Sequence, residues 1–336
     1  MTACFRAAAS PAGATAINEW SGSHMRAVYF ICSNHHWGHV SYRVWDILAE
    51  LGLTGKSAGF RFCGEDVKVH TDGTHEYYFV PTDIALCLDY PRFLPEMKAH
   101  FSDFDMSGMV TWHEGGNAPD NVLTVHSLGD MQSGYYGKAN PRFMRNLLLA
   151  FERNRAALGL EQYHVTTEAT HWSGVHDNHG DAGLLVQFPV PMVDIEVGSA
   201  PASWDDETAC RALAMTLPHV FDDDGRKVHN LLCVGGVHFE PNYAEAALRS
   251  WGDEAFGVTH ILANQWLVSG EYEGENGFER ACACVDSIEG GIQAIVFHDK
   301  MKGCYKDLVR ALGARYQVPF YKHQRLRSPE TMEFAE

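Results

Sequence analysis

Short apolar runs that end at a histidine recur along this chain of 336 residues, and they constrain its fold more than any other feature. Runs of this kind are typical of buried β-strands. The histidines beyond them are His35, His36, His39, His113, His126, His171, His238 and His298. In an open α/β sheet the ends of parallel strands share one edge, where ligands bind. We therefore expect imidazoles from separate strands to converge on one site.

Converging imidazoles indicate an enzyme, and a metal-assisted one. Neutral imidazole is the commonest metal ligand and can also act as a base near pH 7. A single histidine after a strand is more often a hydrogen-bonded turn residue, so the inference depends on the whole group. The sequence has no HExxH, paired CxxC or HxH motif, so the ligands of any metal must come from distant parts of the chain.

Composition restricts the partners and the location of the protein. The net charge is −17, from 43 acidic and 26 basic residues, which disfavours nucleic acid because phosphate contacts need lysine and arginine. The segment Lys322–Arg327 is locally basic, but we expect a solvated tail there. The nine cysteines suggest no disulfide framework, and no apolar stretch reaches the roughly 18 residues that span a bilayer. We expect a reduced, cytoplasmic protein with no membrane segment.

The sequence also predicts the domain organisation of the chain. Residues 1–24 end in Gly22-Ser23-His24, which is typical of a cleaved tag, and we interpret them as a vector-derived leader. Residues 25–322 are predicted to form one α/β domain, and 323–336 a tail. Within the domain, residues 59–80 alternate in polarity around Asp72-Gly73 and predict a hairpin excursion.

Strand and helix patterns alternate along the domain and predict a mostly parallel sheet with helices on both faces. Strands are expected at 26–33, 84–88, 108–112, 122–125, 163–170, 184–198, 229–235, 292–297 and 318–321. Helices are expected at 40–51, 92–100, 141–158, 203–217, 241–251, 278–288 and 302–312. Ser203 is predicted to cap the helix over 203–217.

Three segments carry the most specific chemistry. They are Glu168–Gly174, Gly235–Pro241 and Thr259–Asn264. The turn at Gly235 and Gly236 allows a ligand to approach the backbone closely. Pro241 opens the next helix, whose first N–H groups can bind an anion.

Taken in chain order, these segments resemble the D-aminoacyl-tRNA deacylase family of archaea and plants. That family has an EATHHGP-like motif, then a GGGHYAP-like, a GHI-type and a DWKG-like motif. The resemblance extends to Trp112-His113, Thr124–His126, Tyr136-Gly137, Asp194–Ser199 and His298–Gly303, and it is collinear from about 108 to 322.

The resemblance implies a phosphorylase/hydrolase-like α/β fold, zinc, and hydrolysis of the ester that joins a D-amino acid to tRNA. It carries over His113, His126, Glu168, His171, His238, Pro241, His260 and Asp299. We predict zinc ligands among His113, His126, His171, His238 and, in addition, His36. Catalytic roles are predicted for Glu168, His171, His260 and Lys302, as base, carbonyl-polarising group or charge stabiliser. Substrate contacts are predicted for Gly235, Gly236, Glu240 and Asp299.

The chain also departs from the family pattern. Trp172 replaces a second histidine, and Glu240 places a carboxylate in the expected anion-binding turn, where it would repel a phosphate. The aromatic of the DWKG-like motif is replaced around His298. These departures, with the acidic charge, keep two alternatives open. One is a zinc-dependent hydrolase of a small amide or ester, and the other is a binding protein whose crevice is filled by Trp172 or Trp37. The oligomeric state stays open.

Overall fold

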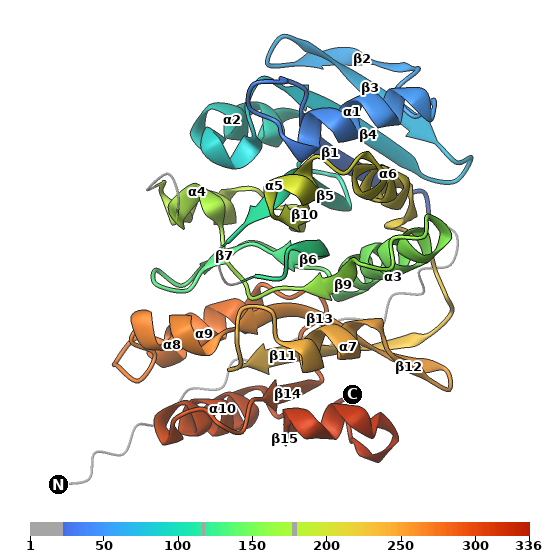
Figure 1. Ribbon diagram of the computed structural model, residues 1–336. Coiled ribbons are helices and arrows are strands. Elements are labelled where there is room, and N and C mark those ends of the chain that lie inside the picture. The colour runs from blue at the N-terminus through green and yellow to red at the C-terminus, as the bar shows by residue number, and fades with distance from the viewer. Residues whose placement is uncertain (1–22, 116–117, 177–179) are drawn as a thin grey trace, which may run out of the picture.

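The computed structural model describes residues 23–115, 118–176 and 180–336. These residues form two large β-sheets with helices packed on them, and one small two-stranded sheet (Figure 1). The predicted α/β class, with a mostly parallel sheet, is confirmed. Residues 1–22 of the predicted leader lie outside the described residues. None of the described helices has the length and apolar composition needed to cross a bilayer.

The strands and helices have the following bounds. The strands are β1 Arg26–Cys32, β2 Ser57–Phe62, β3 Glu65–Thr71, β4 Glu76–Thr82, β5 Met106–Glu114, β6 Asn121–Ser127, β7 Gly129–Asp130, β8 Tyr135–Tyr136, β9 His164–Thr167, β10 Met192–Ser199, β11 Lys227–Val234, β12 Ser250–Trp251, β13 Glu254–Leu262, β14 Ala294–Phe297 and β15 Phe320–Lys322. The α-helices are α1 Val40–Glu50, α2 Tyr90–Phe101, α3 Pro141–Ala157, α4 Ser173–His176, α5 Pro201–Trp204, α6 Glu207–Thr216, α7 Pro241–Leu248, α8 Asn264–Ser269, α9 Gly277–Asp286 and α10 Gly303–Tyr316. The 3₁₀ helices are η1 Leu86–Leu88, η2 Ala182–Gln187, η3 Leu217–His219, η4 His323–Arg327 and η5 Pro329–Thr331.

The first sheet has eight strands in the order β2-β3-β4-β1-β5-β10-β6-β9. The strands from β4 to β10 run parallel, and β6 is antiparallel to β10. The excursion at 59–80 forms an antiparallel meander of β2, β3 and β4, in which β4 also pairs with β1. The predicted turn at Asp72-Gly73 joins β3 to β4, and the Asp72 carboxylate accepts hydrogen bonds from the Thr74 and His75 N–H groups.

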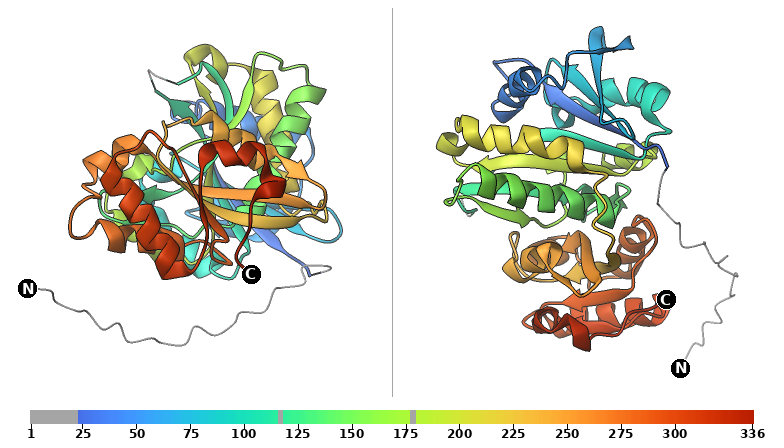
Figure 2. Two further views of the ribbon diagram at one scale, coloured as in Figure 1. Left: turned by 90° about the horizontal axis from the view of Figure 1, so that it is seen from below. Right: turned by 90° about the vertical axis from the view of Figure 1, so that its right-hand side faces the viewer.

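The second sheet has five strands in the order β12-β13-β11-β14-β15, all parallel except β12. It lies beside the β6-β9 end of the first sheet, and α7 of the second sheet packs against β9 (Figures 1 and 2). The segments that carry the three motifs therefore come together at the junction of the two sheets.

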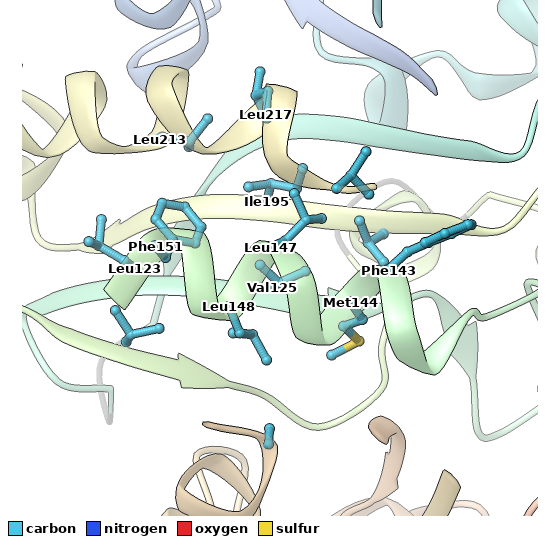
Figure 3. Packing of buried hydrophobic residues seen from close by; sticks show 14 of the residues in the cluster. Leu123, Val125, Phe143, Met144, Leu147, Leu148, Phe151, Ile195, Leu213 and Leu217 are labelled. Carbon is cyan, nitrogen blue, oxygen red and sulfur yellow. The ribbon is translucent and has the colours of Figure 1, made fainter. Parts of the chain in front are cut away.

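One face of the first sheet is covered by α1, α3 and α6. Leu147 and Phe151 of α3 pack on Val125 of β6 and Ile195 of β10, and Leu213 of α6 completes this layer (Figure 3). These side chains are almost fully buried, and each stabilises the fold by about 1.5–3 kcal/mol relative to exposure.

Several local predictions are corrected by the structure. Leu86–Leu88 forms the 3₁₀ helix η1 instead of a strand, because a short apolar run has no periodicity that separates the two. The predicted strand at 184–198 begins only at Met192, because Pro189 and Pro191 cannot donate hydrogen bonds to a ladder. Ser203 lies in α5, and the cap of α6 is Asp206, whose carboxylate accepts from the Thr208 and Ala209 N–H groups.

Residues 323–336 are not a solvated tail. They form η4 and η5, and Leu326 and Met332 are buried in the same core as α3 and α6. The Leu326 carbonyl accepts a hydrogen bond from Arg249, at 3.0 Å. The apolar spacing of this segment outweighs its local basic charge.

Candidate active site

A row of polar side chains lies on the face of the first sheet that α3 and α6 do not cover. Asp194 and Glu196 of β10 alternate with Ile195 and Val197, so they point to the opposite face. The register places Asp194 beside His126 of β6, and Glu196 beside Thr111 of β5. All four polar side chains are buried, with exposed fractions of 0–5%.

His113 lies further along this face, because β5 aligns it with Gly198 of β10. A β-carbon at Gly198 would lie 2.6 Å from the His113 β-carbon, so only glycine fits beside the ring. The sequence predicted that the imidazoles meet in a crevice at the shared ends of parallel strands. They meet instead on the face of the sheet, because β6 runs antiparallel to β10.

The remaining side chains reach this face from other segments. Glu168 and His171 lie in the loop after β9, and His238 lies in the turn after β11 of the second sheet. The two segments are tied together, because the Ala169 N–H donates to the His238 carbonyl at 2.9 Å and the Thr170 N–H donates to the Ile261 carbonyl at 3.0 Å. The site therefore depends on both sheets.

Glu168 is the centre of the group. Its Oε2 accepts a hydrogen bond from His238 Nε2 at 2.7 Å and lies 3.4 Å from His113 Nε2. The rings of His126 and His171 stack on each other with centroids 4.1 Å apart, and each has a ligating atom near Glu168. We call this set, His113, His126, Glu168, His171 and His238, the Glu168 cluster.

The three carboxyl groups differ in ionisation. Burial opposes the ionisation of Glu168, but His126 and the hydrogen bond from His238 outweigh it and hold its pKa well below the usual range. Burial raises the pKa of Asp194 to about 7. Burial, followed by the charges of Asp194 and Glu168, raises the pKa of Glu196 well above its usual value. One buried carboxylate therefore faces the imidazoles, and beside it lies Glu196, whose charged form burial disfavours.

Burial disfavours the charged form of three of the imidazoles, and hydrogen bonds orient their rings. Burial lowers the pKa of His113, His126 and His171. His126 Nδ1 donates to the Ser127 carbonyl at 3.1 Å, and His171 Nδ1 donates to the Ala169 carbonyl at 2.9 Å. His113 Nδ1 is hydrogen-bonded to Ser199 Oγ at 2.7 Å. Such partners on Nδ1 fix the tautomer that offers Nε2 to a metal or substrate.

Aromatic side chains form apolar walls around the cluster. Phe239 contacts the rings of His113 and His238, and Trp266 contacts those of His171 and His238. The two tryptophans considered from the sequence lie elsewhere. Trp172 is fully buried edge-on against Tyr90 in the core beneath α2, and Trp37 is 54% exposed. Neither is the aromatic that lines the imidazoles.

Three predicted site residues lie apart from the Glu168 cluster. His36 is exposed on the loop after β1. Lys302 is exposed where α10 begins, with its ammonium 5.9 Å from the Tyr305 ring centroid. His260 is fully buried, and its ring nitrogens bond to the hydroxyls of Ser127, Thr170 and Ser287 at 2.9–3.1 Å. Because Ser127 follows His126 and Thr170 precedes His171, His260 supports the cluster from behind.

The predicted substrate-binding residues gather at the end of the second sheet. Gly235 and Gly236 have φ values of 83° and 85°, a conformation that favours glycine. A β-carbon at Gly235 would meet His298, and one at Gly236 would meet Glu240. Glu240 caps α7, because its carboxylate accepts from the Asn242 N–H, so the first turn of that helix already holds an anionic group. Asp299 lies beside His298 and His323.

The sequence reading missed Asp194, Glu196, Thr111 and Phe239 as parts of the site. A signal for the first two was present, since two acidic residues alternate within the otherwise apolar strand Met192–Ser199. Buried carboxyl groups are rare unless they are paired or functional. Phe239 lies within the motif Gly235–Pro241, whereas Thr111 gave no comparable signal.

A zinc ion fits the residues of the Glu168 cluster. His113, Glu168 and His238 offer ligand atoms within 4.8 Å of one another, and so do His126, Glu168 and His171. His126 Nε2 is buried with no hydrogen-bond partner among the described residues. Two imidazoles and one carboxylate form a ligand set that catalytic zinc sites use, with one position left for water or substrate.

Comparison with known proteins assigns this chain to a family. The sequence profile of D-aminoacyl-tRNA deacylase matches residues 100–321. The D-aminoacyl-tRNA deacylase of Cenarchaeum symbiosum is 26% identical over 151 residues, which cover 43% of this chain and 53% of that protein. That of Haloarcula marismortui is 29% identical over 194 residues, which cover 54% of this chain and 37% of that protein. The match thus spans only about a third to a half of the length of these relatives.

The crystal structure of a conserved protein of unknown function shares the fold. It superposes with a TM-score of 0.66 at 18% sequence identity, and covers 93% of this chain and 99% of that one. The family profile covers well over half of the chain and includes every residue of the Glu168 cluster. The chain therefore belongs to the D-aminoacyl-tRNA deacylase family.

Proposed function

We propose that this protein hydrolyses the ester bond between a D-amino acid and tRNA, with a zinc ion at the Glu168 cluster. The observation that carries this proposal is that the family profile, over residues 100–321, encloses all five residues of the cluster. The cluster also has the composition that ester hydrolysis needs. It combines a carboxylate whose pKa is held low, imidazoles with Nε2 placed toward it, and aromatic side chains beside their rings.

His113, Glu168 and His238 would hold the zinc ion. When bound there, zinc would supply a water molecule with its pKa lowered toward about 7 and a Lewis acid for the ester carbonyl. The chain's own residues orient the reaction. Glu168 Oε2 is engaged by His238, and the ionised carboxylate would accept the proton of the attacking water. The stacked rings of His126 and His171 lie beside it, each with a ligating atom near Glu168.

A second function, hydrolysis of a small ester or amide without tRNA, is favoured by one observation. The Glu240 carboxylate occupies the N-terminus of α7, where a phosphate would otherwise bind to free N–H groups. The net charge of −17 acts in the same direction. On this proposal the Glu168 cluster keeps its role and only the leaving group changes.

The test is deacylation of matched D- and L-aminoacyl-tRNA by the purified protein, before and after chelator treatment and again after zinc is restored. The proposal expects hydrolysis of the D-ester, sparing of the L-ester, loss with chelator and recovery with zinc. Hydrolysis of a small D-amino acid ester without hydrolysis of the tRNA ester would support the second function. Hydrolysis of the D-ester that persists fully in the chelated protein would reject the role of zinc.

A further inference from the structure

We propose that the basic segment Lys322–Arg327 and the cavity beside it bind the unpaired nucleotides next to the ester, at the 3′ end of the tRNA substrate. The inference rests on the proposed hydrolysis of a tRNA ester, and it names the surface that holds the RNA. Lys322 and Arg325 would bind phosphates, and the ring of Phe320 would stack on a base.

The acidic charge of the chain is unevenly distributed. Eight lysines and arginines but only one acidic residue, Asp307, lie between residues 300 and 328. Lys322, Arg325 and Arg327 are exposed, and no ion pair joins them to a carboxylate of the described residues. A local group of unpaired cations is typical of a surface that binds phosphates. The net charge of −17 therefore does not describe this part of the molecule.

The basic segment is fixed by its contacts with the core. Lys322 is the last residue of β15 and pairs in register with Phe297 of β14. Leu326 is buried, and its carbonyl accepts a hydrogen bond from Arg249 at 3.0 Å. The side chains of Lys322 and Arg325 therefore extend from an ordered backbone, which places their charges at defined positions.

A cavity of about 530 Å³ lies beside these cations, within the range of roughly 300–1,000 Å³ that is usual for ligand sites. Proteins hold single-stranded nucleic acid by combining cations along the backbone with aromatic rings on which bases stack. Base faces are free for such stacking only where the strand is unpaired. The lining of the cavity has this combination of aromatic and polar side chains, namely Phe297, Phe320, Tyr321, Lys322, Gln324 and Arg325.

Phe320 is the aromatic side chain best placed to stack on a base. It is 42% exposed, although large apolar side chains are usually buried. Its inner side is supported, because a β-carbon at Gly313 of α10 would lie 2.9 Å from Phe320 Cδ1. The Phe297 ring lies beside it, with centroids 6.4 Å apart. The ring is therefore held in place while part of it faces solvent.

The cavity shares a sheet edge with the Glu168 cluster. The parallel strands β11, β14 and β15 are neighbours, and Val234, Phe297 and Lys322 align across their ends. His238 of the cluster follows β11. Two strand spacings of about 4.8 Å separate β11 from β15, or about 10 Å. About three stacked nucleotides span this distance at about 3.4 Å each, so a strand whose ester lies at the cluster reaches the cavity.

This placement also accounts for Glu240. Its carboxylate caps α7 and closes the first turn of that helix to a phosphate. The phosphates would bind instead at Lys322 and Arg325. Asp299 is the carboxylate in contact with the lining, where it accepts a hydrogen bond from Gln324 Nε2 at 3.0 Å, and the two cations outnumber it.

The test is the binding of uncharged tRNA, labelled at its 5′ end, to the full chain, measured by fluorescence anisotropy at several salt concentrations. Each phosphate contact that a single strand loses reduces the slope of log K against log salt by about 0.7. Lys322→Gln/Arg325→Gln should therefore reduce the slope by about 1.4. Phe320→Ala should weaken binding by at least about fivefold, the lower limit for one base–aromatic stack, and Phe320→Trp should retain it.

Arg61→Gln/Lys98→Gln is the matched control. It removes the same charge from exposed side chains of β2 and α2, at the other end of the molecule from β15 (Figure 1). Its salt slope should equal that of the unaltered protein. Transfer RNA trimmed of its unpaired 3′ nucleotides should bind more weakly than the intact molecule. Circular dichroism checks that each variant is folded.

Equal slopes for the two double variants, or equal binding of trimmed and intact tRNA, would overturn the proposal. So would binding of AMP that needs Lys322 and Arg325 while tRNA binding does not, since the cavity would then belong to a free nucleotide. The probe carries no ester, so its binding is measured independently of hydrolysis. A protein that binds tRNA as expected but spares the D-ester contradicts the proposed function and not this surface.

Discussion

The two faces of β10 are buried to the same degree, but one carries apolar side chains and the other carries carboxyl groups. Ile195 and Val197 are fully buried against α3 and α6, and Asp194 and Glu196, which alternate with them, are only 0–3% exposed. Burial alone does not separate the two faces. What separates them is the partner that each face meets, apolar helices on one side and imidazoles with a carboxylate on the other.

The difference shows where the fold gains and loses stability. The apolar face gains from side chains removed from water. On the polar face, burial raises the pKa of Asp194 and of Glu196, since it disfavours their charged forms. Locally unfavourable groups retained in a core are expected where function needs them. We therefore expect substitutions on the polar face to change activity most, and those on the helix face to change stability most.

The largest expected effect is that of Glu168→Gln on the polar face. The amide keeps the shape of the side chain but can neither accept a proton nor stabilise the imidazoles as an anion does. Hydrolysis of the proposed ester substrate should slow by about 10²–10⁴-fold, the usual contribution of a positioned acid–base group. Single-turnover deacylation measures the rate, and zinc content measured on the same sample separates a ligand role from a proton-accepting one.

Glu161→Gln is the control for this substitution, because Glu161 is exposed shortly before β9. Its rate should match that of the unaltered protein. A folded Glu168→Gln protein with a rate within a few-fold of the unaltered one would remove Glu168 from the active site.

The helix face is tested by Leu147→Ala in α3. Leu147 is fully buried between α3 and the strands β6 and β10 (Figure 3), so the substitution should lower the free energy of unfolding by about 2–5 kcal/mol. Denaturant unfolding measures the loss. Activity per folded molecule should stay unchanged, because no residue of the Glu168 cluster contacts this face.

Leu51→Ala provides the matched comparison, since Leu51 is 39% exposed. Its expected cost is below about 0.5 kcal/mol, as for most surface substitutions. Equal costs at Leu51 and Leu147 would contradict the assignment of the α3 face as the main core.

His260, which lies behind the polar face, is predicted to make the free energy of unfolding depend on pH. Burial lowers the pKa of His260 from 6.5 to about 3. The unfolded chain then binds a proton more readily than the folded one between these values, so the free energy of unfolding falls as the pH drops through this window and is unaffected above it. The loss amounts to a few kcal/mol over the window, because one pKa unit corresponds to about 1.4 kcal/mol.

Urea unfolding of His260→Gln and of the unaltered protein, at pH 7, 6 and 5, measures this contribution. The variant should be less stable at pH 7 but should lose less stability on acidification. The surface substitution His219→Gln should leave the slope as it is. Parallel slopes for His260→Gln and the unaltered protein would show that His260 is not held neutral.

Much of the fold could be predicted from the sequence, because the spacing of apolar residues indicates which side chains are buried. The strand at 26–32 and the helix at 141–157 were predicted to within a residue or so, since each has a strong apolar pattern. The segment at 84–88 was mistaken for a strand, because a short apolar run carries no period.

The site could be predicted only in part. His113, His126, Glu168, His171 and His238 were selected from motifs, and the structure brings them together. The direction of β6 could not be read from the sequence, so the site was expected at a strand edge and lies on the face of the sheet. Asp194 and Glu196 belong to the site because they lie on that face. The register of β5, β10 and β6 places them there, and this register is a long-range property that the local sequence does not show.

The smallest expected effect tests how α6 is held on the helix face of β10. The Asp206 carboxylate accepts hydrogen bonds from the Thr208 and Ala209 N–H groups and from the Tyr163 hydroxyl, at 2.9–3.2 Å. Asp206→Ala should therefore lower the free energy of unfolding by about 1 kcal/mol, the usual cost of a lost N-cap. Asp205→Ala is the control, because Asp205 only pairs with Arg43 at the surface, at 2.7 Å, and such pairs contribute about 0–1 kcal/mol. Denaturant unfolding under one set of conditions compares the two. A smaller loss for Asp206→Ala than for Asp205→Ala would mean that α6 is held by its packing on β10 alone, and that its first turn needs no cap.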